Sequence, residues 1–233
     1  MRIFGKGFNF SQDGPGNRLV YHLSGCNMHC IWCSNPEGMK LSGGYEVEND
    51  ILLEEIINSK LMFFAGGGVT FTGGEATLQF DDLLYVLKKL KENGIHTTLE
   101  TNGTSNRLNE LLPYIDYLIM DFKHYDSNAL KKYTGIGNEM TKMNFEHNCS
   151  TLRQQHIRIP LINKINTDNP EKFAQYFALF DTTNTVFEFI PYHEYGKDKW
   201  TEQYLVENGF IDKETLELFV LTFKKYNLTL VRT

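Results

Sequence analysis

The sequence predicts an α/β protein built on parallel strands, arranged as a partial (β/α)6 barrel of the TIM type. Short runs rich in β-branched and aromatic residues alternate with helical patterns along the whole chain, which is typical of this class. These runs are almost continuously apolar, as strands are when both faces are covered. Polar residues follow each run at its C-terminal end, where parallel α/β folds bind their ligands.

Six strands are expected from these runs, followed by a final strand near the end of the chain. Strand–helix units in series imply a parallel sheet with right-handed crossovers. Six units are too few to close the eight-stranded barrel, so an open or partial barrel fits best, with a flat doubly wound sheet as the alternative. The expected strands are residues 18–24, 69–72, 96–101, 117–123, 156–162 and 186–191, and the final one is 228–232.

Amphipathic stretches between the runs predict the helices. In one of them Leu83, Leu84, Leu87 and Leu90 recur at steps of three and four residues, the period of a helix. The dipeptide Asn93-Gly94 then supplies a helix stop. The expected helices are residues 50–59, 81–93, 107–114, 170–180 and 213–226.

Length and composition limit the class of protein. The chain has 233 residues and a formal net charge of −6, which suits one domain of α/β barrel size. No stretch approaches the roughly 20 apolar residues of a membrane span, and residues 1–17 lack the apolar core of a secretory signal. Clustered Cys without a signal indicates the cytoplasm. The acidic balance, without a dense Lys/Arg stripe, argues against nucleic acid as the main partner.

Cys26, Cys30 and Cys33 form a CxxxCxxC motif directly after the first expected strand. Iron–sulfur clusters are held by Cys thiolates, and three protein ligands to a four-iron cubane leave one iron open to a substrate. A structural zinc site with His29 as fourth ligand is the alternative. A disulfide framework is disfavoured because three clustered Cys and the distant Cys149 do not pair sensibly, so Cys149 is expected to be a buried small hydrophobe.

Polar residues at the other strand ends predict one site for a polar, zwitterionic ligand. The glycines Gly73 and Gly74 would let the backbone approach the ligand closely. The carboxylate of Glu75 could pair with an ammonium group, and Lys123 or Arg158 with a carboxylate. Asp121 and Glu100 are candidates for a cation site or a polar network, with a structural salt bridge as the alternative. In chain order the strand-end residues are Thr72-Gly73-Gly74-Glu75, Glu100-Thr101-Asn102-Gly103, Asp121, Lys123, His124, Arg158 and Tyr192-His193-Glu194.

These motifs resemble the radical S-adenosylmethionine (radical SAM) enzymes, specifically the activases of glycyl radical enzymes. The resemblance covers nearly the whole chain, because several motifs agree with the family in order and spacing. It implies the radical SAM fold, a single domain over residues 1–233 and the chemistry of an oxidoreductase. The matching motifs are the Cys triplet with Trp32 and Asn35-Pro36, the glycine-rich residues 66–76, and residues 101–103, 120–123, 157–160 and 191–193.

The resemblance also implies a role for each site residue. Cys26, Cys30 and Cys33 would hold one [4Fe–4S] cluster, and S-adenosylmethionine would chelate its fourth iron. Thr101 and Asp121 fall where the family binds a monovalent cation, Na+ or K+, although Glu100 replaces the usual Asp and Ser34 the usual His. Residues 13–18 and Arg158 would face the partner's glycine loop. The cofactor-binding residues would be Trp32, Ser34, Asn35, Gly73, Gly74, Glu75, Thr101, Asn102, Lys123, His124, Arg158 and His193.

The activity implied by the resemblance is reductive cleavage of S-adenosylmethionine, with removal of a glycine Cα hydrogen from a partner enzyme. Reduced flavodoxin or ferredoxin would supply the electron, within anaerobic metabolism, and the chain would act as a monomer. Only Cys149 lies outside the triplet, so the ferredoxin-like insert of many activases is absent, which favours pyruvate formate-lyase as partner. The alternatives are an activase of another glycyl radical enzyme such as anaerobic ribonucleotide reductase, a radical enzyme acting on a small molecule, and a non-catalytic metal-binding module.

Overall fold

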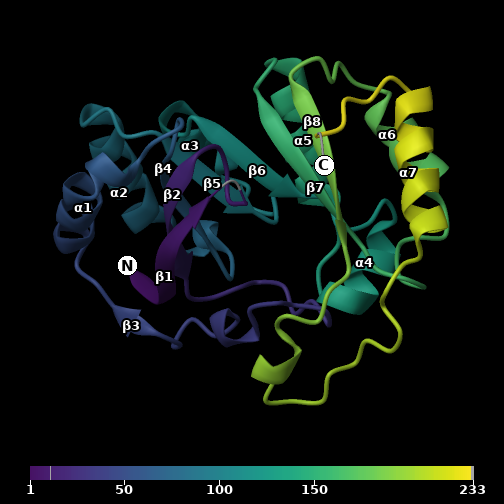
Figure 1. Cartoon of the computed structure of the whole chain (residues 1–233), viewed down its shortest axis with the longest axis horizontal. Coiled ribbons are helices and arrows are strands. Elements are labelled where there is room, and N and C mark those ends of the chain that lie inside the picture. The colour runs from purple at the N-terminus through teal and green to yellow at the C-terminus, as the bar shows by residue number, and fades with distance from the viewer. Residues whose placement is uncertain (11, 232–233) are drawn as a thin grey trace. The chain divides into compact units, whose positions relative to one another are not determined.

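A computed structural model describes residues 1–10 and 12–231 (Figure 1). These residues form two compact units, each assembled from separate stretches of the chain. The first unit comprises Met1–Asn27, Asn35–Thr101 and Ser105–Ile119, and the second comprises Met28–Ser34, Asn102–Thr104 and Met120–Thr233. The CxxxCxxC motif thus contributes Cys26 to the first unit and its other two thiols to the second. The expectation of a single domain stays a prediction.

The strands follow the order β3-β1-β2-β4-β5-β6-β7-β8. The pairs β2–β4, β4–β5 and β7–β8 are parallel, whereas β1 runs antiparallel to both β2 and β3. The predicted α/β class, an open sheet of mostly parallel strands, is confirmed. The strands are β1 (Arg2–Phe10), β2 (Asn17–Leu23), β3 (Tyr45–Glu46), β4 (Gly68–Gly73), β5 (Thr97–Thr101), β6 (Tyr117–Asp121), β7 (Gln155–Leu161) and β8 (Thr185–Pro191).

The six predicted strands are β2, β4, β5, β6, β7 and β8, with bounds within two residues of the expected ones. Strand β1 was not predicted, because an antiparallel strand with one exposed face lacks the continuous apolar run by which the others are recognised. The final strand expected over 228–232 is reduced to one bridge between Leu230 and Phe187, and residue 232 lies outside the described part.

All five predicted helices are present, although α3 is a single turn and α6 ends three residues before the expected position. Helices α4 and α5 were not predicted. The buried face of α5 carries Thr141, Asn144 and Asn148, so its sequence has no apolar period. No helix in the described part of the chain has the length and apolarity that crossing a membrane requires. The helices are α1 (Asn49–Asn58), α2 (Phe80–Glu92), α3 (Leu108–Leu111), α4 (Ser127–Thr134), α5 (Glu139–Ser150), α6 (Pro170–Phe177) and α7 (Lys213–Lys225).

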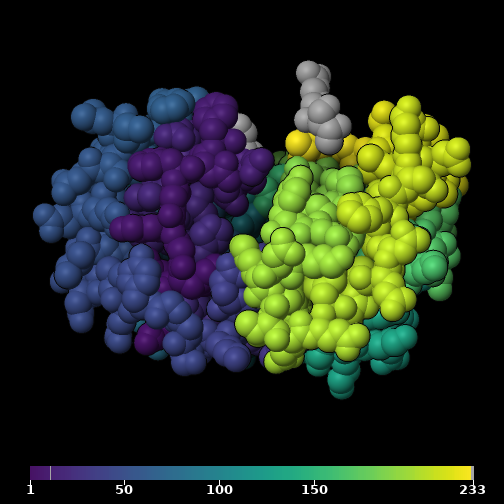
Figure 2. Space-filling model, turned by 60° about the horizontal axis from the view of Figure 1, so that its bottom comes forward, coloured from purple at the N-terminus to yellow at the C-terminus, as the bar shows by residue number. Residues whose placement is uncertain are grey.

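Each unit buries its own apolar core between helices and strands. In the first unit Tyr21 of β2 stacks on Phe71 of β4 and donates a hydrogen bond of 2.8 Å to Glu55 of α1. In the second unit α6 and α7 pack on β8, where the rings of Phe177 and Phe187 lie 4.7 Å apart. The segment after β8, yellow-green in Figure 2, forms part of the molecular surface.

The first unit contains a fully buried arginine, Arg18, at the start of β2. Its guanidinium donates to the Thr70 hydroxyl (2.6 Å) and to the carbonyl oxygens of Val69 (2.6 Å) and Pro15 (2.9 Å). Burial lowers the pKa of Arg18 to about 10, against the opposing effect of the Asp13 charge. Arg18 is thus an anchor that ties the loop before β2 to β4, and its side chain is not free to meet a partner protein.

Replacing Arg18 with Leu removes these hydrogen bonds and leaves buried acceptors without donors. We expect the free energy of unfolding to fall by about 3 kcal/mol or more, since each unsatisfied buried group costs about 1–3 kcal/mol. Arg107→Leu is the control, because Arg107 makes exposed ion pairs with Glu110 and Asp81 and should cost about 1 kcal/mol or less. Urea denaturation of both variants measures the difference, and equal losses would contradict the anchoring role.

Candidate functional site

The glycine pair at the end of β4 packs against the backbone that leads into Cys26. A Cβ added at Gly74 would lie 2.2 Å from the carbonyl oxygen of Gly25, and Gly73 has a φ of +124° that disfavours any side chain. The amides of Gly74 and Glu75 donate to the carbonyl oxygens of Leu23 (2.8 Å) and Gly25 (2.7 Å). The amides of Gly74 and Glu75 are therefore committed to the backbone of residues 23–25, and the predicted role of Gly73 and Gly74 at the cofactor stays a prediction.

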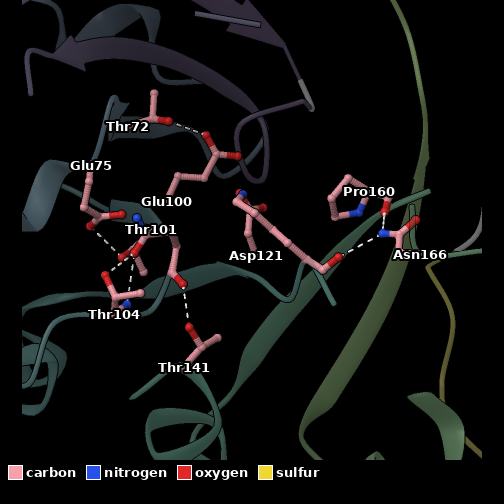
Figure 3. A network of polar contacts seen from close by, with 11 residues as sticks. Thr72, Glu75, Glu100, Thr101, Thr104, Asp121, Thr141, Pro160 and Asn166 are labelled. Carbon is pink, nitrogen blue, oxygen red and sulfur yellow. Dashed lines mark hydrogen bonds and ion pairs between the residues drawn. The ribbon is translucent and has the colours of Figure 1, made fainter. Parts of the chain in front are cut away.

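Glu75 is almost completely buried, at 1% exposure, directly after this pair. Its Oε1 accepts hydrogen bonds from the Thr77 amide (3.1 Å), the Thr77 hydroxyl (2.6 Å) and the Thr101 hydroxyl (2.7 Å). Figure 3 shows Glu75 and Thr101 facing each other, and the bond from Thr72 to the Glu100 carboxylate (2.6 Å) beside them. The end of β4 and the end of β5 thus share a fixed carboxylate in the first unit.

The first unit also contains the residues on either side of Met28–Ser34, which are Cys26 and Asn27 before this stretch and Asn35 after it. The amide of Cys26 donates to the carbonyl oxygen of Met39 (3.0 Å), so the chain returns past the first thiol after the motif. Asn35 occupies the N-cap position of a short 3-10 helix, Pro36–Gly38, and its carbonyl oxygen accepts from the Gly38 amide (3.0 Å). These contacts fix the course of the backbone on both sides of the motif.

In the second unit the end of α4 holds the middle of the Cys loop. The amides of His29 and Ile31 donate to the carbonyl oxygens of Thr134 (2.8 Å) and Tyr133 (3.2 Å). The amide of Cys33 donates back to Cys30 (3.0 Å), which forms a tight turn between the two thiols. Carbonyl groups that would be left unpaired at a helix C-terminus are thereby satisfied by the Cys loop.

The segment after β8 covers the same loop. The indole of Trp200 donates to the carbonyl oxygen of Cys33 (3.0 Å), and a Cβ on Gly196 would lie 2.3 Å from the carbonyl oxygen of Ser34. Trp32 and Ile31 pack against the buried cluster of Ile162, Tyr192 and Val206. Trp32 is therefore a packing residue as well as a predicted cofactor neighbour, and its predicted role at the cofactor stays a prediction.

Lys123 and Asp121, at the end of β6, form an ion pair in the second unit. The backbone of Lys123 is held by Asn166, which is fully buried and which sequence reasoning did not identify. Its side-chain amide donates to the carbonyl oxygens of Lys123 (2.8 Å) and Pro160, and its Oδ1 accepts from the Ile162 amide (2.8 Å). Figure 3 shows Asn166 pointing at Pro160. Asn166 thus couples the end of β6 to the end of β7.

Arg158 of β7 is directed to a carboxylate of the neighbouring strand. Its Nε lies 2.9 Å from Glu188 Oε2, and His156 Nε2 lies 3.0 Å from the same oxygen. Burial raises the pKa of Glu188, but the contacts with His156 and Arg158 outweigh it, so the net pKa is lowered. Glu188 was not predicted, because a Glu inside an apolar strand run resembles an outward-facing residue.

The two predicted histidines differ in how their ring nitrogens are used. Nδ1 of His193 is buried with no hydrogen-bond partner among the described residues, and the ring stacks on Tyr195 at 4.3 Å. In His124, Nδ1 accepts from the Asp126 amide (2.9 Å) and Nε2 lies 3.0 Å from the Ile165 carbonyl oxygen. His193 can still accept or donate a bond to a ligand, whereas His124 has both nitrogens committed to the backbone. The role of His124 in cofactor binding stays a prediction.

Asn102 belongs to a polar network of its own in the second unit. Its Oδ1 accepts from the amide (3.0 Å) and the hydroxyl (2.6 Å) of Thr104, and its carbonyl oxygen accepts from the Thr141 hydroxyl (3.0 Å). These bonds, visible in Figure 3, connect the loop after β5 to α5. They explain why the buried face of α5 carries polar residues.

The four cysteines carry thiol groups, in agreement with the interpretation that they do not form a disulfide framework. Within residues 1–10 and 12–231, no group of three or more His, Cys, Asp or Glu side chains is assembled as a metal site. The assignment of Cys26, Cys30 and Cys33 as cluster ligands, and of Thr101 and Asp121 as cation ligands, therefore stays a prediction. Cys149 is buried beside Gln155, as expected for a small hydrophobe.

Comparison with known proteins matches residues 20–177 to the Radical SAM superfamily. A relative from Clostridium pasteurianum named "Pyruvate formate-lyase-activating enzyme" is 33% identical over 199 residues, covering 81% of this chain and 80% of the relative. A protein of the same name from Staphylococcus aureus (strain USA300) is 35% identical over 202 residues, covering 81% and 79%.

Two solved structures share the fold. The crystal structure of a domain of pyruvate-formate lyase-activating enzyme from Bacteroides vulgatus ATCC 8482 superposes with a TM-score of 0.60 at 26% identity, covering 71% of this chain and 98% of that one. Streptococcus suis SuiB bound to precursor peptide SuiA superposes with a TM-score of 0.71 at 17% identity, covering 91% of this chain and 48% of that one. The second likeness concerns the fold alone.

Replacing Asn166 with Ala should destabilise the second unit, because it leaves two buried carbonyl oxygens and one amide without partners. We expect the free energy of unfolding to fall by about 3 kcal/mol, at about 1–3 kcal/mol per unsatisfied group. Asn163→Ala is the control, since Asn163 makes one exposed side-chain bond, to Asn208, and should cost less than about 1 kcal/mol. Denaturant midpoints test this, and a neutral Asn166→Ala would contradict the coupling of β6 to β7.

His124 should make stability fall as the solution becomes acidic. Burial lowers the pKa of His124 in the folded protein, so below about pH 6.5 the unfolded chain binds more protons than the folded one. Each such proton steepens the dependence by up to about 1.4 kcal/mol per pH unit. Urea unfolding between about pH 7.5 and 5.5 should give a shallower slope for His124→Asn than for the exposed control His147→Gln. Equal slopes would mean that the pKa of His124 is the same in the folded and the unfolded protein.

Proposed function

Because the chain belongs to the Radical SAM superfamily, we propose that it is an activase that installs a glycyl radical on a partner enzyme, pyruvate formate-lyase. Relatives named "Pyruvate formate-lyase-activating enzyme", of which the chain covers about four-fifths, support this proposal. The structural observation that carries it is the packing of Gly74 and Glu75 on Gly25. This contact holds the backbone of Glu75, whose carboxylate is buried, against the residue that precedes Cys26.

The donor set of the chain fits one [4Fe–4S] cluster and S-adenosylmethionine. Cys26, Cys30 and Cys33 carry thiols, the ligand type that iron–sulfur clusters require, and would hold the cluster through three of its irons. When bound, cluster and cofactor together supply a one-electron cleavage of the sulfonium and the removal of one hydrogen from a glycine Cα. The buried and unpaired Nδ1 of His193 supports a ligand in the second unit, where this nitrogen would meet the adenosine.

The protein's own groups would bind and orient the amino-acid end of the cofactor. The carboxylate of Glu75 suits an ammonium group, because three donors already hold its Oε1 and binding needs no rearrangement of this side chain. Lys123 would meet the cofactor carboxylate, with Asp121 limiting the positions of its ammonium group. The predicted Na+ or K+ would bind at Thr101 and Asp121. Trp32 and Trp200 would exclude water from the Cys loop.

The proposal includes features that the fold leaves open. The chain would act as a monomer in the cytoplasm and receive its electron from reduced flavodoxin or ferredoxin. Residues 1–233 would form one radical SAM domain without a ferredoxin-like insert. Activation of another glycyl radical enzyme is the alternative, and the assay below distinguishes the two by offering each candidate partner.

Cys33→Ala should abolish cluster loading, because only two of three thiolates remain. After anaerobic reconstitution, wild type should bind about four irons per chain. On reduction with S-adenosylmethionine and formate-lyase, it should give the doublet of a glycyl radical in electron paramagnetic resonance. Cys33→Ala should show neither signal. Cys149→Ala is the matched control, since Cys149 is buried beside Gln155, away from the motif, and should retain both.

Two other outcomes would overturn parts of the proposal. Cofactor cleavage without a doublet on any offered glycyl radical enzyme would retain the radical chemistry and reject the activase function. A wild-type chain that binds zinc instead of iron would reject the cluster assignment altogether.

A further inference from the structure

Lysines flank the Cys loop on both of the segments that hold it in the second unit. Lys131 and Lys132 lie in the last turn of α4, whose terminal carbonyl groups accept bonds from His29 and Ile31. Lys197 and Lys199 lie in the segment after β8, where Nζ of Lys199 is 3.4 Å from the carbonyl oxygen of Ser34. Each of the two segments that contact Met28–Ser34, the stretch that carries two of the three motif thiols, therefore contains two lysines.

Aromatic rings connect two of these lysines to the loop. Nζ of Lys132 lies 5.0 Å above the ring of Tyr133, and that ring is 6.4 Å from Trp32. A favourable cation–ring contact of this kind is worth about 0.5–1 kcal/mol at an exposed site. It holds a positive charge beside the aromatic residue that precedes Cys33.

The opposite segment repeats the arrangement. Nζ of Lys197 lies 5.7 Å above the ring of Tyr204, and that ring is 5.6 Å from Trp200, which donates to Cys33. Each of the two segments that hold the loop thus contains a lysine in contact with a tyrosine ring. We call Lys131, Lys132, Lys197 and Lys199 the lysine border.

The lysine border has the opposite charge to the rest of the protein. The chain carries a formal net charge of −6, yet Met28–Ser34 and α4 contain no acidic residue. Lys131 and Lys132 are exposed and make no ion pair within the described residues. The nearby carboxylates are Glu139, which interacts electrostatically with Lys131, Glu194, which pairs with Lys197 at 2.9 Å, and Asp198. A local positive field on an acidic protein selects a partner with a negative face.

We propose that the lysine border is the docking surface for an acidic one-electron carrier protein, whose electron sits on a flavin or an iron–sulfur cluster. The inference rests on the proposed function, because a cluster held by the motif thiols gives the electron its destination. One electron leaves the reduced carrier, which is oxidised by one unit, and the cluster is reduced by one unit. Docking on both segments that hold the Cys loop keeps the transfer path short.

The charge pattern favours a carrier over the enzyme that receives the radical. A carrier must bind, deliver one electron and leave, and charged surfaces accelerate such brief encounters by raising the association rate. The receiving enzyme must instead insert a backbone segment, which depends on shape and apolar contact. Nucleic acid is disfavoured by the net negative charge of the chain.

The test reverses the two unpaired lysines in the variant Lys131→Glu/Lys132→Glu. The control, Lys213→Glu/Lys224→Glu, makes the same change in net charge on α7 of the same unit. Purified flavodoxin, an acidic flavoprotein, serves as the probe. Its binding to each reconstituted holoenzyme is measured at low salt and at about 0.5 M salt, where charge interactions are screened. Formation of 5′-deoxyadenosine is then compared with reduced flavodoxin and with dithionite as the electron source.

We expect the Lys131/Lys132 variant to bind flavodoxin about tenfold more weakly at low salt, with little difference from wild type at high salt. Its flavodoxin-driven rate should fall by a similar factor below saturation, while the dithionite-driven rate stays unchanged. The α7 control should match wild type within about twofold in both measurements.

Three results would overturn the inference. Unchanged flavodoxin binding in the Lys131/Lys132 variant would place the carrier elsewhere. A loss of glycyl radical formation that persists with dithionite would assign the lysine border to the receiving enzyme. A wild-type chain that binds no cluster would overturn the proposed function, and the inference with it, whereas the first two results leave the proposed function intact.

Discussion

The close approach of two backbones, Gly73-Gly74 at the end of β4 and Leu23-Gly25 at the end of β2, is the contact on which the first unit's half of the candidate site depends. No side chain fits at Gly74, where a Cβ would lie 2.2 Å from the carbonyl oxygen of Gly25. The resulting two hydrogen bonds, donated by the amides of Gly74 and Glu75, fix the backbone that enters the Cys loop. They also set the position of the buried Glu75 carboxylate, because they hold the backbone of Glu75 in place. The glycines are therefore required by the protein's own packing before any ligand is considered.

Three buried polar side chains, Arg18, Glu75 and Asn166, are each held by several hydrogen bonds to their neighbours. Arg18 gives its guanidinium to neutral acceptors, Glu75 receives three donors on one oxygen, and Asn166 uses both ends of its amide. A buried polar group without partners is costly, so these networks hold one geometry only. Nδ1 of His193 is instead buried without a hydrogen-bond partner among the described residues, as are Oδ1 of Asn138 and Oδ1 of Asn148 in the same unit. A ligand that reaches His193 would satisfy this nitrogen.

In the second unit the Cys loop has a structural role beside the reactive role proposed for its thiols. The end of α4 and the segment after β8 hold residues 28–34 through backbone bonds and the Trp200 indole. Both segments also carry the lysine border, so the elements that position the thiols would receive the carrier protein. A charged surface on α4 and on the segment after β8 would bring the electron donor close to the Cys loop without occupying the interior. The substrate side of the site would then remain free for the partner's glycine.

The sequence by itself determined the α/β class, the strands β2 and β4 to β8, and five of the seven α-helices found in the described residues, because continuous apolar runs and helical periods are local signals. It also predicted the Cys motif and the strand-end residues, since residue type and spacing carry their chemistry. Only the tertiary structure identified Asn166 and Glu188. Their sequence context gives no signal, because their contacts with Lys123 and Arg158 form only in the folded chain. It also decided that the amides of Gly74 and Glu75 serve packing, that His124 bonds to backbone, and that α5 is a helix with a polar buried face. These outcomes depend on contacts between residues that are distant in the sequence, and a local sequence pattern does not specify such contacts.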